Sequence, residues 1–225
     1  MNNCVFVTGT GTDVGKTFVT ALIVKKLCGM GINAGYYKFA ASGEVIDNLP
    51  ADAWHVKTVA NLPDDKFVSY AYKEAVSPHL AAKLENRPIE LSVLERDFEA
   101  ARNKFEFLVV EGSGGIICPL RFDEQRVFLA DLVKKFGLPV IIVADSGLGA
   151  INATVLTAEY LWAKNIPTRG VVLNRFDEKN LIDVDNAKMI AALTGLPIIA
   201  KVPANATEIF WEEGFWKSGL MTTST

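Results

Sequence analysis

The fold of this chain is indicated first by the stretch Gly9-Thr10-Gly11-Thr12-Asp13-Val14-Gly15-Lys16-Thr17. It follows the apolar run Cys4–Thr8 and precedes a segment of helix length, which is the setting of a phosphate-binding loop. Glycines let several backbone N–H groups converge on phosphate oxygens, and the helix N-terminus adds a partial positive charge. Lys16 can bridge the terminal phosphates, and the Thr17 hydroxyl can bind Mg²⁺. The stretch therefore predicts a nucleotide-binding P-loop protein, against the alternative of a glycine-rich turn beside an ordinary surface lysine.

The motif departs from the general spacing at one position. Thr10 stands five residues before Gly15, where the general pattern has glycine, and Gly9 lies one residue too early. A phosphate loop longer by one residue is therefore expected. The motif points firmly to nucleotide binding and says little about which reaction follows.

Outward from this loop, short β-branched runs alternate with amphipathic segments of helix length. Runs such as Phe107–Val110 and Val140–Val143 are apolar on both faces, as strands are when helices cover both sides of a parallel sheet. The alternation predicts an α/β fold with a doubly wound, mainly parallel sheet and right-handed βαβ units. The expected strands are Cys4–Thr8, Ala34–Lys38, Phe105–Val110, Val140–Ala144, Gly170–Leu173 and Ile198–Val202. The expected helices are Lys16–Cys28, Leu91–Lys104, Phe128–Phe136, Ala150–Lys164 and Val184–Leu193.

The organisation predicted along the chain is one domain over residues 1–217, with a polar tail at 218–225 that is expected to be disordered. The less regular stretch from Ala41 to about Pro88 is expected to be a loop-and-helix insertion beside the sheet. Trp211 and Trp216 near the tail fit either a partner-binding patch or a cap on the core.

Composition excludes several classes of function. The chain has 225 residues, 50% of them hydrophobic, and a net charge of -3 with no polybasic run, which argues against nucleic acid as a partner. The apolar runs are too short to cross a bilayer, and no signal-peptide pattern opens the chain, so no membrane association is expected. Cys4, Cys28 and Cys118 are scattered without a CxxC pair, which predicts reduced thiols and a cytoplasmic location. Cys118 follows a glycine-rich loop, so it either lines a site or is buried.

Charged residues follow the predicted strands at the edge where ligands of parallel sheets bind. Lys38 ends the second strand and is placed to neutralise charge on a transferred phosphoryl group, unless it is an ordinary surface lysine. Glu111 follows four apolar residues and is placed to hold Mg²⁺, with Gly112–Gly115 allowing a close approach of backbone to ligand. Either Asp47 or Asp52 can complete the metal shell, although Asp52 also fits the role of a helix N-cap.

Together these motifs resemble the dethiobiotin synthetase family. The resemblance extends from about Cys4 to Pro203, and the longer phosphate loop is the family's own form. It rests on several motifs in the family's order, namely Thr8-Gly9-Thr10, Val14-Gly15-Lys16-Thr17, Tyr37-Lys38, Ala41-Ser42-Gly43, Ser77-Pro78-His79, Arg87-Pro88-Ile89-Glu90, Val110-Glu111-Gly112, Gly114-Gly115, Pro119-Leu120, Leu148-Gly149, Ile151-Asn152 and Leu156-Thr157-Ala158.

The resemblance implies an ATP-dependent ring-closing ligase acting on 7,8-diaminopelargonate. One amine takes up CO₂, ATP phosphorylates the carbamate, and the second amine closes the ureido ring, with Mg²⁺ bound at the site. The catalytic residues implied are Lys16 and Lys38, and the metal ligands are Thr17, Asp52 and Glu111. Nucleotide contacts are implied for Asp13, Val14, Gly15, Lys16, Thr17, Phe18, Asn174, Arg175, Pro203, Ala204 and Asn205. Substrate contacts are implied for Thr12, Ser42, Glu111, Gly112, Ser113, Gly114 and Gly115.

The resemblance also implies a homodimer. In the family, the substrate carboxylate lies at a helix N-terminus of the neighbouring subunit, and the matching residues here are Gly149, Ala150, Ile151 and Asn152. The sequence departs from the family at a few positions: Asp13 replaces Glu, Phe39 replaces Pro, Ser113 replaces Ala, and Ala204-Asn205 replace the usual nucleotide-loop residues.

The identity of the nucleotide base stays open at this point. In the family, the asparagine at Asn174 hydrogen-bonds adenine, which favours ATP. Asp177, three residues later, also resembles the aspartate with which GTPases bind guanine, or else it begins a solvated polar loop. We therefore expect ATP as the working nucleotide, with GTP also accepted.

Two rival functions share these motifs in part. An amidoligase of the cobyric-acid type activates a carboxylate, but such enzymes usually carry a glutaminase domain, for which this chain has no room. A partitioning or maturation ATPase acts as a switch on protein partners, but its phosphate loop typically begins Lys-Gly-Gly, whereas this one begins Thr8-Gly9-Thr10.

Overall fold

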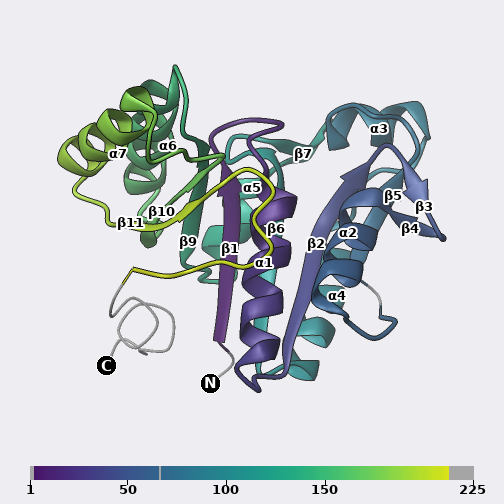
Figure 1. Cartoon of the computed structure of the whole chain (residues 1–225). Coiled ribbons are helices and arrows are strands. Elements are labelled where there is room, and N and C mark those ends of the chain that lie inside the picture. The colour runs from purple at the N-terminus through teal and green to yellow at the C-terminus, as the bar shows by residue number, and fades with distance from the viewer. Residues whose placement is uncertain (1–2, 66, 213–225) are drawn as a thin grey trace.

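The computed structural model of the chain describes residues 3–65 and 67–212 (Figure 1). Within them, seven parallel strands form one sheet in the order β11-β10-β9-β1-β6-β2-β5. Two short antiparallel hairpins, β3-β4 and β7-β8, lie apart from that sheet. The strands of the sheet are β1 (Asn3–Gly9), β2 (Ala34–Ser42), β5 (Val68–Tyr72), β6 (Phe107–Gly115), β9 (Val140–Asp145), β10 (Thr168–Asn174) and β11 (Ile198–Val202). The hairpin strands are β3 (Val45–Ile46), β4 (Leu49–Pro50), β7 (Pro119–Phe122) and β8 (Arg126–Phe128).

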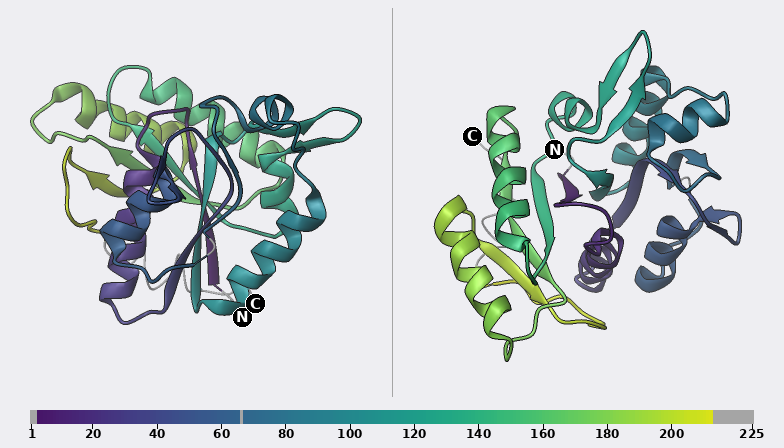
Figure 2. Two further views of the ribbon diagram at one scale, coloured as in Figure 1. Left: turned by 90° about the vertical axis from the view of Figure 1, so that its right-hand side faces the viewer. Right: turned by 90° about the horizontal axis from the view of Figure 1, so that it is seen from above.

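Helices cover both faces of the sheet, as Figure 2 shows in the view from above. One hydrophobic core lies under α1 (Lys16–Gly29) and α2 (Ala51–Ala60). The other lies under α3 (Pro78–Leu84), α4 (Leu91–Lys104), α5 (Leu129–Lys135), α6 (Ala150–Ala163) and α7 (Leu181–Thr194). The central strands are buried from both sides, because β6 and β9 alternate between the two cores: Val109 and Ile141 enter one, and Val110 and Ile142 enter the other.

The predicted α/β fold with a doubly wound parallel sheet is therefore confirmed. All six predicted strands are present, and Ile198–Val202 and the helix Leu91–Lys104 have the bounds expected. The prediction that Lys38 ends one strand and that Glu111 follows another was wrong, because β2 continues to Ser42 and β6 continues to Gly115.

The prediction for the stretch from Ala41 to about Pro88 was wrong in one respect. This stretch supplies β5, the edge strand of the main sheet, in addition to α2, α3 and the β3-β4 hairpin. β5 pairs with β2 alone and is buried only at Tyr70 and Tyr72. An edge strand of this kind carries no continuous apolar run, so the sequence signal for it is weak.

Two further predictions concern the ends and the membrane. The predicted tail at 218–225 and Trp216 lie outside the described residues. Trp211 is described, and it packs against the core under α1, which favours the reading of a core cap. Over residues 3–65 and 67–212, no helix is long and apolar enough to cross a membrane.

The topology places the site. The chain leaves β1 toward β2 and later passes from β6 to β9, on the opposite side of β1. Since all seven strands are parallel, their carboxyl ends meet at one edge of the sheet, at the top of Figure 1. A crevice at such a switch point is where open α/β sheets bind ligands.

Candidate active site

The phosphate loop joins β1 to α1 in the strand–loop–helix setting that the motif requires. Asp13 and Gly15 have positive φ angles of 59° and 86°. Gly15 is required for a second reason, because a Cβ atom there would lie 2.0 Å from the Asn174 side-chain nitrogen. The Lys16 ammonium donates to the Gly11 carbonyl oxygen at 2.8 Å and is largely buried, and burial lowers the pKa of this lysine below its ordinary value.

The end of β10 supports the back of this loop. The Asn174 amide nitrogen donates to the Val14 carbonyl oxygen at 3.0 Å, and the Arg175 guanidinium donates to the Asp13 carbonyl oxygen at 2.8 Å. Arg175 also forms an ion pair with Asp145 at the end of β9. The Asn174 side-chain oxygen is buried and has no hydrogen-bond partner among the described residues, so it is an acceptor open to a ligand's N–H group.

A charged cluster lies at the middle of β2 and β6, beside the start of α1. Lys38 and Glu111 are direct partners in the parallel register of these two strands, and the Lys38 ammonium lies 2.8 Å from Glu111 Oε1. The same ammonium lies 2.5 Å from Asp52 Oδ2, in the first turn of α2. The Thr17 hydroxyl approaches both acids, at 2.8 Å from Glu111 Oε1 and 3.1 Å from Asp52 Oδ1. The alternative that Lys38 is a surface lysine is therefore wrong, because its side chain is 5% exposed and paired twice.

The electrostatics of the cluster follow from this pairing. Burial by itself lowers the pKa of Lys38, but the charges of Glu111 and Asp52 outweigh it and hold that pKa above the ordinary lysine value. Burial raises the pKa of Asp52, while Lys38 and the Thr17 hydroxyl outweigh it and hold that pKa below the usual aspartate value. The carboxylate of Glu111 is fully buried and also accepts a hydrogen bond from the Tyr36 hydroxyl, at 3.1 Å. Burial and the nearby carboxylates raise the pKa of Tyr36 well above its ordinary value.

The donor set suits a magnesium ion. A hydroxyl oxygen from Thr17 and carboxylate oxygens from Asp52 and Glu111 converge directly after the phosphate loop, and Mg²⁺ prefers hard oxygen ligands of this kind. Asp47 lies elsewhere, in the two-residue turn of the β3-β4 hairpin, where its carboxylate accepts from the Trp54 indole N–H at 3.0 Å. The alternative role of Asp52 as a helix N-cap is wrong, because Pro50 holds that position and Asp52 lies inside the first turn.

A groove of about 1160 Å³ runs over this cluster. It gathers most of the residues expected at the site, which are Thr12, Asp13, Gly15, Lys16, Thr17, Phe18, Lys38, Ser42, Asp52, Glu111, Ser113, Gly114 and Arg175. Cys118 is both buried and a lining residue, and burial raises the pKa of its thiol to about 11. A thiol with that pKa is a poor nucleophile near neutrality.

Gly112 and Gly114 meet two different requirements at the end of β6. A Cβ atom at Gly112 would lie 2.8 Å from the Phe6 ring, and Gly114 has a positive φ of 67°. Ser113 donates its hydroxyl hydrogen to the Ala40 carbonyl oxygen at 2.5 Å, which ties β6 to β2 beside the groove.

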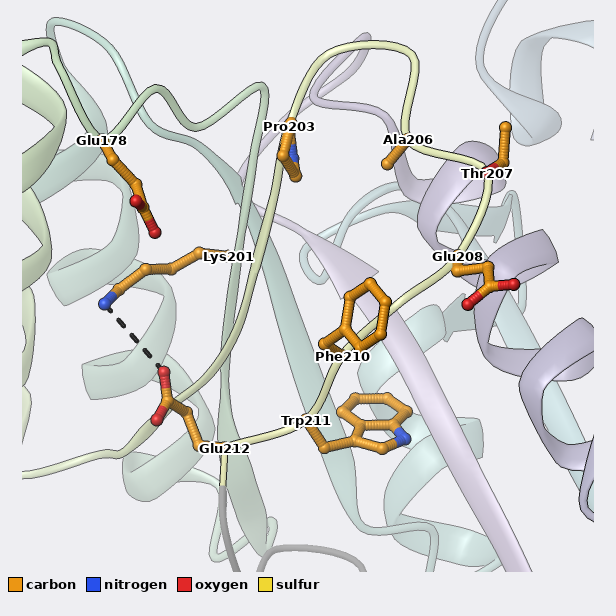
Figure 3. A pocket seen from close by; sticks show the side chains of 9 residues that line it. All are labelled: Glu178, Lys201, Pro203, Ala206, Thr207, Glu208, Phe210, Trp211 and Glu212. Carbon is orange, nitrogen blue, oxygen red and sulfur yellow. Dashed lines mark ion pairs between the residues drawn. The ribbon is translucent and has the colours of Figure 1, made fainter.

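Three groups of expected site residues do not line this groove, and the first group is Val14, Gly112, Gly115 and Asn174. Gly149, Ala150, Ile151 and Asn152 form the start of α6 and do not line it. Pro203, Ala204 and Asn205 follow β11, and Pro203 lines a separate hollow of about 770 Å³. Figure 3 shows that this hollow lies between β11 and the returning segment that carries Phe210 and Trp211.

Several groove residues were not predicted as site residues. Trp54 and His55 line the groove from α2 and belong to no motif, whereas Pro78, at the start of α3, belongs to the motif Ser77-Pro78-His79. Tyr36 reaches Glu111 from below and does not line the groove. Only its place two residues before Lys38 on a predicted strand, and therefore on the same face, offered a signal.

Known proteins match this chain over most of its length. Residues 3–208 match a family model described as AAA domain. The chain is 49% identical over 205 residues to the ATP-dependent dethiobiotin synthetase BioD of Brachyspira hyodysenteriae, and the match covers 90% of this chain and 92% of that protein. It is 47% identical over 199 residues to a protein of the same name from Clostridium botulinum strain Eklund 17B, and that match covers 86% of this chain and 88% of that protein.

Solved structures agree on the fold. FtsY from Mycoplasma mycoides superposes with a TM-score of 0.54 at 14% identity, over 95% of this chain and 65% of that one. The MinC:MinD cell division complex of Aquifex aeolicus also gives a TM-score of 0.54 at 14% identity, over 89% of this chain and 81% of that one. At such low identity the likeness concerns the fold alone.

Proposed function

Because this chain belongs to the family of ATP-dependent dethiobiotin synthetases, which are ligases of biotin biosynthesis, we propose that its groove closes the ureido ring of dethiobiotin on 7,8-diaminopelargonate. The observation that carries the proposal is the meeting of Lys16, Lys38, Thr17, Asp52 and Glu111 at one end of the sheet. These residues offer positive charge and metal-binding oxygens beside a phosphate loop.

The reaction proceeds in three steps whose atoms balance. One amine of the substrate attacks CO₂ and loses a proton, which gives a carbamate. A carbamate oxygen attacks the terminal phosphorus of ATP, and ADP leaves, which gives a mixed carbamic–phosphoric anhydride. The second amine attacks the carbonyl carbon of that anhydride, and phosphate leaves as the ring closes.

Lys16 and Lys38 serve the second step. Negative charge spreads over the oxygens of the phosphoryl group while it moves from ADP to the carbamate, and fixed cations stabilise that charge. Lys16 lies at the start of α1 within the phosphate loop, and Lys38 lies on β2, where it pairs with Glu111, the acid that the Thr17 hydroxyl also approaches. Both lysines line the groove, which supports a role for each at the transferred group.

Thr17, Asp52 and Glu111 would hold Mg²⁺. When bound, the ion adds positive charge at the phosphate oxygens of ATP. The support is the donor set, because three oxygens of the kind that Mg²⁺ prefers converge at the first residues of α1.

The diamine would lie over the end of β6. Thr12, Ser42, Ser113 and Gly114 line the groove there. The backbone of Gly112 and Gly115 would complete the substrate contacts. The substrate carboxylate would bind at Gly149–Asn152 of a second subunit, in a homodimer. Two features support this assignment: no side chain caps the N-terminus of α6, and the adjacent Leu148 is 89% exposed.

The base of ATP would lie against the end of β10. The buried Asn174 side-chain oxygen lacks a donor within the described chain, and the exocyclic amine of adenine can supply one. Asp177 is exposed, and its carboxylate accepts from the backbone N–H of Lys179 at 2.9 Å, which supports the reading of a solvated loop residue. Phe18, Arg175, Pro203, Ala204 and Asn205 would complete the nucleotide contacts.

A phosphate-release assay tests the proposal. We expect ATP hydrolysis to be slow alone and to rise only when both diaminopelargonate and bicarbonate are present. A partitioning ATPase would respond to neither compound, and a carboxylate-activating amidoligase would not need bicarbonate. Release that is independent of the diamine would therefore contradict the proposed reaction.

A further inference from the structure

Tyr36 lies directly beneath the charged cluster without touching the groove. It faces Val109 in the parallel register of β2 and β6, two residues before the pair formed by Lys38 and Glu111. Residues two apart on a strand share a face, so Tyr36 and Lys38 project to the same side of the sheet. The Tyr36 side chain is 1% exposed and packs beside the Phe67 ring. No substrate in the groove can reach it.

The two oxygens of Glu111 have different partners. Oε1 accepts from the Lys38 ammonium and from the Thr17 hydroxyl, both at 2.8 Å. Oε2 accepts from the Tyr36 hydroxyl at 3.1 Å. Because the carboxylate is fully buried, water cannot replace a lost donor at Oε2.

From this geometry we infer that Tyr36 is a positioning residue, which fixes the Glu111 carboxylate so that Oε1 faces Thr17 and Lys38. The inference rests on the proposed role of Glu111 as a metal ligand. A carboxylate held at one oxygen alone can turn about its last bond, whereas a donor at each oxygen fixes its plane. Partners that orient a metal ligand in this way matter nearly as much as the ligand itself.

The variant Tyr36→Phe removes only the hydroxyl and keeps the ring. Titration calorimetry of ADP with and without Mg²⁺ gives the factor by which the metal tightens nucleotide binding. We expect Tyr36→Phe to weaken metal-dependent binding by about 10- to 100-fold, the range seen when such a partner is lost. Binding of ADP in the presence of a chelator should remain at the wild-type value, because Tyr36 does not touch the nucleotide's place in the groove.

Tyr37→Phe is the matched control. Tyr37 is the next residue, is fully buried, and shares its hydroxyl with the Ser69 hydroxyl at 2.6 Å, on the opposite face of β2. The same atom is removed from an equally buried ring, but away from Glu111. We expect this variant to keep the wild-type response to Mg²⁺, whatever it does to thermal unfolding.

A double variant shows whether Tyr36 acts through Glu111. In a Glu111→Gln background, Tyr36→Phe should cause no further loss of metal-dependent binding, because the carboxylate that Tyr36 orients is already absent. A full additional loss there would overturn the inference.

The remaining outcomes separate this inference from the proposed function. If wild-type protein binds ADP equally with and without Mg²⁺, the metal role of Glu111 fails, and the inference fails with it. If the wild type responds to Mg²⁺ and Tyr36→Phe responds equally, only the role of Tyr36 is overturned. If Tyr36→Phe does not fold while Tyr37→Phe does, the hydroxyl supports folding and the positioning role is likewise overturned.

Discussion

Lys16 and Lys38 are both buried lysines near the same carboxylates, yet their pKa values move in opposite directions. Burial dominates at Lys16, whose ammonium donates to the Gly11 carbonyl oxygen, and the pKa falls. At Lys38, two direct ion pairs outweigh burial, and the pKa rises. Lys38 therefore remains a fixed cation across the whole neutral range, as a residue that stabilises phosphoryl charge must.

We predict that Lys38→Ala and Lys16→Ala each lower turnover by about 10²–10³-fold, because each removes a cation that acts on the transition state. Steady-state rates of phosphate release with both substrates present measure this. Lys135→Ala is a suitable control, since Lys135 is another lysine paired with an acid, Glu95, but lies on the surface of α5. Near-normal turnover in Lys38→Ala would show that this lysine does not stabilise charge.

Asp52 and Asp47 lie five residues apart, and only Asp52 meets Thr17. We predict that Asp52→Asn raises the Mg²⁺ concentration needed for half-maximal activity by more than about tenfold. Asp47→Asn should leave that concentration unchanged, since Asp47 contacts Trp54 in a hairpin turn. A crystal structure soaked with the metal that places Asp47 in the shell would reverse the assignment while leaving the reaction intact.

Among the elements, the strands that are buried on both faces were predictable and the edge strand was not. In an alternating α/β pattern, an apolar run such as Phe107–Val110 predicts a buried strand. In contrast, β5 is half exposed, and its sequence resembles that of a loop. The site divides in the same way. The phosphate loop follows β1 directly, and Lys38 and Glu111 lie on β2 and β6, two strands that the sequence predicted. Their meeting at one end of the molecule therefore followed from the order of elements.

The rest of the site depends on packing between elements, which could not be predicted from the sequence. Asp52 reaches Thr17 because α2 packs against α1, and that helix falls in the stretch that lacked a clear pattern. The sequence placed Tyr36 on the same strand face as Lys38, but its hydrogen bond to Glu111 is evident only in the structure. Contacts between residues far apart in the chain decide both roles.

The end of β10 bears on the choice of nucleotide. The Asn174 amide nitrogen is already engaged by Val14, so its oxygen is the group left to meet the base, and it accepts from adenine but not from guanine O6. One unpaired buried acceptor costs about 1–3 kcal/mol. We predict that ATP is preferred and that GTP is still used, with a ratio of kcat/KM values below about a hundredfold, or 2.7 kcal/mol. A larger preference would show further contacts to adenine beyond Asn174.

At the scale of the whole molecule, we predict a homodimer with two sites at the interface. The residues Gly149–Asn152 lie outside the groove of their own chain, next to the exposed Leu148 and one turn before Leu156, whose side chain is 61% exposed. Analytical ultracentrifugation checks the assembly, and a fully active monomer would contradict it. A mixing experiment is sharper: Lys38→Ala and Asn152→Asp, each inactive alone, should regain turnover when their subunits exchange, because one site of the mixed dimer is intact.

One measurement tests most directly whether the whole reaction takes place in this site. The purified protein is incubated with ATP, Mg²⁺, 7,8-diaminopelargonate and isotope-labelled bicarbonate, and the products are identified by mass spectrometry. We predict dethiobiotin that carries the label in its ureido carbonyl group, formed together with an equal amount of phosphate and lost in the Lys38→Ala variant. Consumption of ATP without a labelled ring, or ring closure without ATP, would contradict the account.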